Sequence, residues 1–325
     1  MSRYGGIDLG GTKIQAVVTD EEHDVLGSAR HPTPTTGGPA DVTLAMIAAL
    51  HEAAEDAGVS RGDLTAVGVG SPGAVDDEAG TVTSARNLPD WEGTYPLAEK
   101  LETALMAPVG LSNDVNVATI AEFELGAARP FRSTLGVFWG TGVGGGVVLD
   151  GQLWEGRGAA GEIGHMVVKS DGRECPCGRI GCMEAYAGRG AMEARAREKV
   201  AEGEKTVLFD IMEDKGKPRL ASGIWERALA RDDKLAHRLV DSAVDAIGVG
   251  VGSALNLLDV EAVVIGGGLG LRLGEPYVER IRDAIMPHLF ADHRPPEVLL
   301  ASLGDLGGAV GATLLAAQQA PLPQR

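Results

Sequence analysis

The chain contains the same local pattern twice, once at its start and once near its middle. Residues 4–19 read as a strand, a glycine turn and a second strand, and residues 134–150 repeat that order. Apolar runs on both sides of a short glycine-rich turn are typical of a β-hairpin. The repetition predicts two similar βββαβα units, one opening each half of the chain, that face each other across a cleft between two glycine turns.

The remaining segments predict an α/β fold. Apolar residues at helical spacing are expected to form helices, and short apolar runs ending at glycine or polar residues are expected to form strands. The expected helices cover residues 39–57, 97–106, 115–126, much of 184–256 and the segment after Gly308, and the further strands cover 64–70, 109–114 and 260–270. Residues 321–325 are expected to fray. A length of 325 residues exceeds the usual size of a single core, so two domains are expected.

The charge of the chain excludes some classes of partner. It has 46 acidic and 29 basic residues, a net charge of -17, and no stripe of Lys and Arg. Such a surface repels a phosphate backbone, so nucleic acid is not expected as a partner. No apolar run reaches the roughly 18 residues that span a bilayer, and the N-terminus lacks the apolar core of a signal peptide. We therefore expect a cytoplasmic protein without a membrane partner.

All three cysteines and one histidine lie within an 18-residue stretch, as His165, Cys175, Cys177 and Cys182. These are the ligands of a closed Cys3His zinc site. One disulfide plus one free thiol is the alternative, but an acidic chain without a signal peptide belongs to a reducing compartment, where clustered cysteines more often bind metal. Because no coordination position is left for water, we expect the zinc to shape a loop and not to activate a nucleophile.

The glycine turns predict phosphate binding. The first turn places Asp8 at a strand end, followed by Gly10, Gly11, Thr12 and Lys13. Backbone N–H groups in such a turn can donate to phosphate oxygens, although Asp8 could instead cap the turn and Lys13 could be a surface residue.

Two further turns are expected to bind the rest of a nucleotide. Gly140–Gly144 would bind a second part of the polyphosphate, and Gly266, Gly267 and Gly268 would let the backbone approach an adenosine closely. No G-x-x-x-x-G-K-[ST] string occurs, which excludes a P-loop.

Together these motifs resemble the ROK family of sugar kinases, within the actin-like ATPase and hexokinase superfamily. The resemblance covers essentially the whole sequence and rests on DLGGTK at 8–13, ND at 113–114, WGTGVGGG at 139–146, GEIGHM at 161–166, CPCGRIGCME at 175–184 and IGGG at 265–268. It implies two actin-like (ribonuclease H-like) domains that close over a sugar and a nucleotide. The first would span residues 1–115 and be rejoined by a C-terminal helix at 308–325, and the second would span 116–307 and carry the zinc loop at 165–182.

The resemblance also implies roles for single residues. Asp114 would be the general base that takes the proton of the attacking sugar hydroxyl. Residue type alone would make Asp114 a helix cap, and would make Glu162 and Glu184 surface charges. The implied sugar ligands are Asn87, Asn113, Glu162, His165 and Glu184, with Ser71-Pro72-Gly73 as a neighbouring wall. His165 would be shared between the zinc and a sugar hydroxyl.

The implied cofactors are ATP, Mg²⁺ and a structural Zn²⁺. Asp8 would lie near Mg²⁺, through water, and Thr12, Lys13, Thr141 and Gly142 would surround the β- and γ-phosphates.

The function that follows is ATP-dependent phosphorylation of glucose at O6, by a homodimer or homotetramer. Other hexoses, N-acetylglucosamine and N-acetylmannosamine remain alternatives, whereas polyphosphate as donor is disfavoured because no basic groove is evident. A sugar-sensing repressor would need an added DNA-binding domain, which we do not expect because the first phosphate motif begins within ten residues of Met1. A non-catalytic sugar-binding protein would not need both Asp114 and the phosphate turns.

Overall fold

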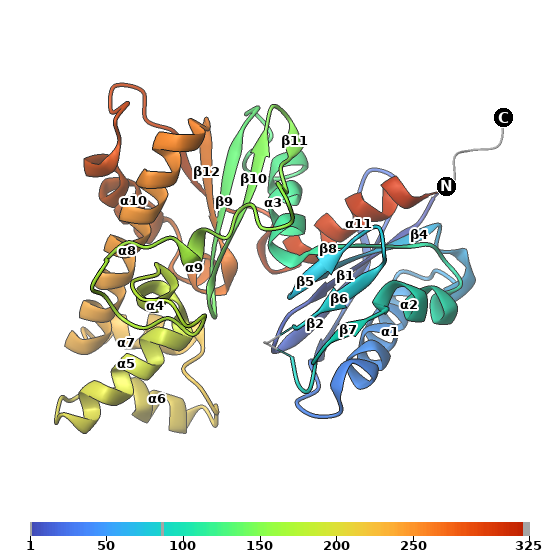
Figure 1. Cartoon of the computed structure of the whole chain (residues 1–325). Coiled ribbons are helices and arrows are strands. Elements are labelled where there is room, and N and C mark those ends of the chain that lie inside the picture. The colour runs from blue at the N-terminus through green and yellow to red at the C-terminus, as the bar shows by residue number, and fades with distance from the viewer. Residues whose placement is uncertain (1, 86–87, 321–325) are drawn as a thin grey trace. The chain divides into compact units, whose positions relative to one another are not determined.

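A computed structural model describes residues 2–85 and 88–320 (Figure 1). The chain forms two compact units. The first comprises the chain up to Gly126 and again from Ser302 onward, and the second comprises Ala127–Ala301. The expected boundaries, after residues 115 and 307, differ from these because the helix that begins at Asp114 packs inside the first unit, against the C-terminal helix.

The first unit is built on a five-stranded sheet with the order β3-β2-β1-β4-β8. Strands β1, β2 and β3 are antiparallel neighbours, as the opening hairpin pattern predicts, whereas β4 and β8 run parallel to β1. A small second sheet has the order β5-β6-β7. The strands are β1 (Tyr4–Leu9), β2 (Lys13–Thr19), β3 (Val25–Pro32), β4 (Ala66–Ser71), β5 (Ala74–Asp76), β6 (Thr81–Thr83), β7 (Thr94–Tyr95) and β8 (Val109–Asn113).

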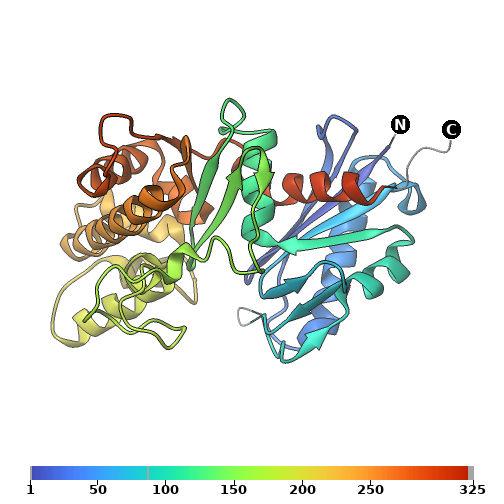
Figure 2. The same cartoon turned by 45° about the horizontal axis from the view of Figure 1, so that its top comes forward.

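Helices cover both faces of the five-stranded sheet, with α1 on one face and α11 on the other (Figures 1 and 2). Side chains alternate between the faces of a strand, and adjacent glycines of β1 follow this rule. A Cβ atom on Gly5 would meet Leu50 of α1, and one on Gly6 would lie 2.0 Å from the carbonyl oxygen of Ala309 in α11. The helices are α1 (Gly38–Asp56), α2 (Leu97–Leu105), α3 (Asp114–Glu124) and α11 (Gly307–Gln319), with short 3-10 turns at Arg61–Asp63 and Gly304–Leu306.

The second unit repeats the strand arrangement of the first. Its sheet has the order β11-β10-β9-β12-β13, in which β9, β10 and β11 are antiparallel neighbours and β12 and β13 run parallel to β9. The repeated hairpin in the sequence therefore marks a repeated topology, and the α/β fold class is confirmed. The strands are β9 (Thr134–Trp139), β10 (Val143–Leu149), β11 (Gln152–Leu153), β12 (Ala262–Gly266) and β13 (Glu297–Leu300).

Helices α8, α9 and α10 gather on one side of this sheet (Figure 1). They bury a core that includes alternate residues of β9, namely Leu135, Val137 and Trp139. The helices are α4 (Glu184–Ala187), α5 (Arg189–Ala201), α6 (Leu208–Asp214), α7 (Ser222–Leu229), α8 (Lys234–Leu258), α9 (Gly267–Leu273) and α10 (Glu275–Ile285), with 3-10 turns at Ile163–His165 and Met286–His288.

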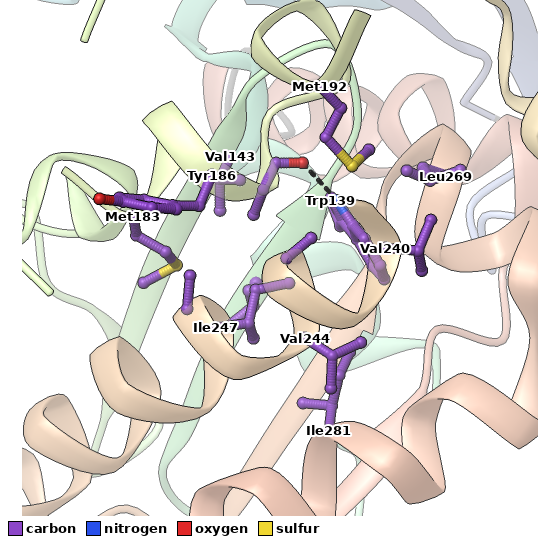
Figure 3. Packing of buried hydrophobic residues seen from close by; sticks show 14 of the residues in the cluster. Trp139, Val143, Met183, Tyr186, Met192, Val240, Val244, Ile247, Leu269 and Ile281 are labelled. Atoms are coloured by element: carbon purple, nitrogen blue, oxygen red, sulfur yellow. Dashed lines mark hydrogen bonds between the residues drawn. The ribbon is translucent and has the colours of Figure 1, made fainter. Parts of the chain in front are cut away.

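Trp139, the last residue of β9, lies at the centre of this core (Figure 3). Its ring packs with Val240 and Leu269, and its indole N–H donates a 2.7 Å hydrogen bond to the carbonyl oxygen of Ala187. A buried indole N–H needs such a partner. The bond connects the end of β9 to Ala187, the last residue of α4, just before α5 begins.

Of the helices in the described ranges, none combines the length and apolarity that crossing a membrane requires.

Candidate functional site

The junction of β8 and α3 carries two of the residues singled out in the sequence. The N-cap of α3 is Asn113 and not Asp114: the side-chain oxygen of Asn113 accepts from the backbone N–H groups of Val115, at 3.0 Å, and Asn116, at 3.3 Å. Asp114 is the first helical residue, and its carboxylate also accepts from Val115 at 3.0 Å. Both residue types are good N-caps. Asn113 takes this role because its backbone is extended, as an N-cap requires. The amide NH2 of Asn113 thus remains as the group that can donate to a ligand.

The first glycine turn brings Asp8 close to a cation and a helix start. Lys13 lies 3.6 Å from the carboxylate of Asp305, and a Cβ atom on Gly308, in the first turn of α11, would lie 2.8 Å from the Asp8 carboxyl carbon. Burial raises the pKa of Asp8, and the charge of Lys13 opposes this effect only in part. A divalent cation would stabilise the ionised carboxylate further, so the site suits Mg²⁺. Gly11 and Thr12 at the tip of the turn are exposed.

The other two glycine turns lie side by side in the second unit. Parallel strands β9 and β12 end at the same edge of the sheet, so the turn at 140–142 and the start of α9 are neighbours. A Cβ atom on Gly267, whose φ is +78°, would lie 2.6 Å from the backbone of Trp139, so only glycine fits there. Thr141 and Gly268 are both exposed at this edge. The two turns predicted to bind different parts of a nucleotide therefore form one continuous surface.

The four predicted metal ligands lie together. The ligating atoms of His165 and the three cysteines are all within 4.8 Å of one another. The sulfurs of Cys177 and Cys182 are 3.8 Å apart, and Nδ1 of His165 is 3.9 Å from the sulfur of Cys175. Zn–S bonds of 2.3 Å in a tetrahedron place two sulfurs about 3.8 Å apart, so the cluster fits zinc. The cysteines form no disulfide, so that alternative is wrong.

The backbone of the loop brings these ligands together. Val167 and Glu174 each form a β-bridge across the loop, to Cys182 and Ile180 respectively. A Cβ atom on Gly181, whose φ is +83°, would lie 1.8 Å from the carbonyl oxygen of Lys169, which makes glycine a requirement there. Short turns with small residues let the three cysteines, which lie within one eight-residue stretch, meet one histidine.

The three thiols differ in how readily they lose the proton that zinc binding displaces. Burial raises the pKa of the Cys175 thiol to about 12 and also raises the pKa of Cys182, whereas the backbone N–H of Arg179 lowers the pKa of Cys177 to about 6. Zinc binds thiolates, so its binding releases the protons that burial would otherwise retain.

The ring of His165 connects the cysteines to a carboxylate. Its Nδ1 faces the thiols, and its Nε2 lies 3.8 Å from the carboxylate of Glu162, which is 63% exposed. A metal on Nδ1 would therefore fix the ring with Nε2 directed toward Glu162. The pair offers one donor or acceptor and one carboxylate to a polar ligand.

Glu184 lies at the glycine turn of the second unit. Its carboxylate accepts a 2.9 Å hydrogen bond from the backbone N–H of Val143, next to Gly142. The second unit thus holds Glu162, Glu184, the cluster of His165 and three cysteines, and two glycine turns. The first unit holds Asp8, the first glycine turn, Asn113 and Asp114. Asn87 lies outside the described residues.

Arg189 and Ser222, at the glycine turns of the second unit, were not predicted from the sequence. Arg189 donates to the hydroxyl groups of Thr141 and Ser222, each at 2.9 Å. The only sequence signal was a cation between two glycines in an acidic chain, in the run Gly188-Arg189-Gly190.

Comparison with known proteins gives consistent results. The family model described as "ROK family" matches residues 4–319. A glucokinase of Streptomyces coelicolor is 34% identical over 98% of this chain and 98% of the relative. An N-acetyl-D-glucosamine kinase of Salmonella typhimurium is 32% identical over 96% of this chain and 98% of the relative. The crystal structure of a ROK family glucokinase from Streptomyces griseus in complex with glucose and AMPPNP has a TM-score of 0.83, at 33% identity, over 98% of this chain and 100% of that chain.

Proposed function

Because the chain belongs to the ROK family, we propose that it is a sugar kinase that transfers the γ-phosphate of ATP to O6 of glucose. The similarity to the Streptomyces coelicolor glucokinase supports glucose as the acceptor. The similarity to the Streptomyces griseus enzyme, solved with glucose and AMPPNP, supports both the acceptor and an adenine nucleotide as donor.

Asp114 is the proposed general base. It lies at the start of α3, is half-buried, and is kept in place by Val115 and by the cap that Asn113 provides. A carboxylate in this position can accept the proton of a sugar hydroxyl as the oxygen attacks phosphorus. The NH2 group of Asn113 would donate to a neighbouring hydroxyl of the same sugar.

The observation that carries the proposal in the second unit is the position of His165 between the thiols and Glu162. An ionised carboxylate accepts from two hydroxyls at once, and the adjacent ring nitrogen adds a second directed contact. Such a pair suits vicinal sugar hydroxyls. Glu184 is the third proposed sugar ligand of this unit, and it would exchange or share its bond to Val143 when a sugar binds.

The glycine turns are the proposed donor site. Asp8 would hold Mg²⁺ through water, and the ion would supply positive charge to the phosphates. Thr12 and Lys13 in the first turn, and Thr141 and Gly142 in the second, would donate to the β- and γ-phosphates. Lys13 would turn from Asp305 to do so. Gly267 and Gly268 let the start of α9 approach the adenosine.

Zinc is proposed as a structural cofactor of the loop at 165–182. It would fix the tautomer and orientation of His165 and close the loop that leads into Glu184. An assembly of two or four copies is proposed as well, and size-exclusion chromatography with light scattering tests it.

A coupled assay with a panel of sugars tests the function. Purified protein is assayed with ATP, or with polyphosphate, against glucose, mannose, fructose, N-acetylmannosamine and N-acetylglucosamine. The expected result is the highest kcat/KM with glucose and ATP. The Salmonella relative makes N-acetylglucosamine the second candidate. A higher kcat/KM for that sugar would reassign the acceptor, and no ATP-dependent product with any sugar would refute the proposal.

A further inference from the structure

Arg189 begins α5 and is fixed to the glycine turn of the second unit. Its backbone N–H donates to the carbonyl oxygen of Gly140 at 3.1 Å, and the next N–H, of Gly190, donates to that of Thr141 at 3.0 Å. The buried bond from the Trp139 indole to Ala187 holds the preceding residues (Figure 3). The start of α5 therefore cannot move independently of the turn.

The side chain of Arg189 extends from that turn to the start of α9. Its Nη2 donates to the hydroxyl of Thr141 and its Nη1 to the hydroxyl of Ser222, both at 2.9 Å. Ser222 begins α7, which packs against α9. The Oγ of Ser222 lies 3.7 Å from where a Cβ atom on Gly268 would be. The guanidinium thus lies along the edge shared by the two glycine turns.

The positive charge of Arg189 is only partly compensated, by the nearby charge of Glu193. Both of its hydrogen-bond partners are neutral hydroxyls, and within the described residues no carboxylate forms an ion pair with it. The nearby carboxylate of Glu193 is buried and is already bound by Arg197, Arg219 and the backbone N–H of Leu220. In a chain with a net charge of -17, an arginine left without a carboxylate marks a place where a ligand can supply the negative charge.

The electrostatic surroundings strengthen this interpretation. Partial burial, and then the charge of Arg219, lower the pKa of Arg189, and the charge of Glu193 opposes this effect only in part. The guanidinium nevertheless stays protonated, because the ordinary pKa of arginine lies far above neutral pH. A bound anion would offset both the burial of the guanidinium and its repulsion by Arg219. The planar guanidinium also has the geometry to donate to two phosphate oxygens.

We infer that Arg189 is a donor-binding residue whose guanidinium binds the α- and β-phosphates of the nucleotide, an inference that rests on the proposed kinase function. The turn at 140–142 is the proposed site of the terminal phosphates and the start of α9 that of the adenosine, so the phosphates nearest the nucleoside lie between them. Neutral hydroxyls are weak competitors for the guanidinium. It would release Thr141 and Ser222 when the nucleotide binds, leaving the Thr141 hydroxyl to donate to phosphate.

Isothermal titration of ADP, and separately of adenosine, into the full chain tests the inference without depending on turnover. The variants are Arg189→Gln and Arg189→Lys, and the matched control is Arg195→Gln, on the same helix but paired with Glu198. Losing a hydrogen bond to a charged group corresponds to a loss of affinity of about 10- to 100-fold. We expect that loss for ADP with Arg189→Gln, less than about 2-fold for adenosine, a smaller loss for ADP with Arg189→Lys, and no change for the control.

Two results would overturn the inference. Unchanged ADP affinity in Arg189→Gln would remove Arg189 from the site. An equal loss for ADP and adenosine would show that Arg189 only holds the two turns in position. If Arg189→Gln does not fold, the ratio of ADP to adenosine affinity in Arg189→Lys decides, and an unchanged ratio refutes the inference. Wild-type protein that binds no ADP would instead refute the proposed function.

Discussion

Asp114 illustrates how a helix terminus can combine structure and chemistry at neighbouring positions. Asn113 provides the cap of α3, so the carboxylate of Asp114 is not needed for that purpose. This division allows the two roles to be separated by substitution, since removing the charge of Asp114 leaves the cap in place.

Asp114→Asn is expected to lower kcat by about 10²- to 10⁴-fold, the range typical of lost general-base catalysis, because the amide cannot accept the hydroxyl proton. Loss of a charge in the first turn of a helix costs at most about 1 kcal/mol, so the melting temperature should change little. Steady-state kinetics, sugar affinity and thermal melting are measured beside Glu124→Gln, an exposed charge loss at the other end of α3. A kcat close to that of the wild type would refute the base role.

Glu184→Gln is expected to raise KM for glucose by about 10-fold, with little change in KM for ATP, because an unpaired hydroxyl in a buried site costs about 1–3 kcal/mol. Glutamine retains an oxygen that can accept from Val143, so the glycine turn should persist. Kinetics with each substrate varied in turn measure the effect, with the exposed Glu198→Gln as control. Equal glucose KM values in variant and wild type would place Glu184 outside the sugar site.

At the scale of elements, the loop at 165–182 is expected to depend on the proposed zinc ion as well as on its own contacts. Two isolated β-bridges, several backbone hydrogen bonds and the buried side chains of Cys175, Cys182 and Met183 hold residues 166–183. Structural zinc can contribute on the order of 10 kcal/mol to the folding of small zinc peptides, so losing the ion should loosen the loop despite these contacts.

Freshly prepared protein is therefore expected to contain one zinc per chain by elemental analysis. Cys177→Ser should lose the metal and weaken glucose binding more than ADP binding, because His165 loses its orientation. His293→Gln, an exposed histidine outside the motif, is the control and should retain zinc. Active protein that carries no metal would contradict this prediction.

The contact of α11 with its sheet requires glycine on two neighbouring strands. A Cβ atom on Gly68 of β4 would lie 1.8 Å from the carbonyl oxygen of Ala312, as one on Gly6 would meet Ala309. Gly68→Ala should therefore separate helix and sheet and lower the melting temperature by about 5 °C or more. Gly62→Ala, where a Cβ atom meets no atom within 4 Å, should be nearly neutral. Equal melting temperatures would show that the packing adapts without cost.

At the scale of the whole molecule, the net charge restricts which ligands can bind, and the repeated hairpin determines the topology. The net charge of -17 repels polyanions, so the proposed function requires local groups to bind the nucleotide, and the glycine-turn N–H groups and Arg189 are the proposed ones. The topology follows instead from the duplicated hairpin, which was readable because glycine turns and apolar strands are local signals.

Other features could not be read from the sequence. Whether Asn113 or Asp114 caps α3 depends on one backbone torsion, and both residue types suit the position. The boundary at Gly126 depends on packing between α3 and α11, which are about 180 residues apart in the chain. The position of Arg189 depends on the hydrogen bond from Trp139 to Ala187, two residues that are 48 positions apart in the chain. The cysteine cluster was predictable because its members are close in sequence.

The discontinuous first unit has a consequence for synthesis on the ribosome. Strands β1 and β4 emerge early, but the helix that covers their Gly6 and Gly68 face is translated only after the whole of Ala127–Ala301. A nascent chain therefore carries a half-finished sheet with one bare apolar face for most of its elongation, while the intervening unit can complete its own core. Such a surface is a target for chaperones, and the final helix acts as the closing step of assembly.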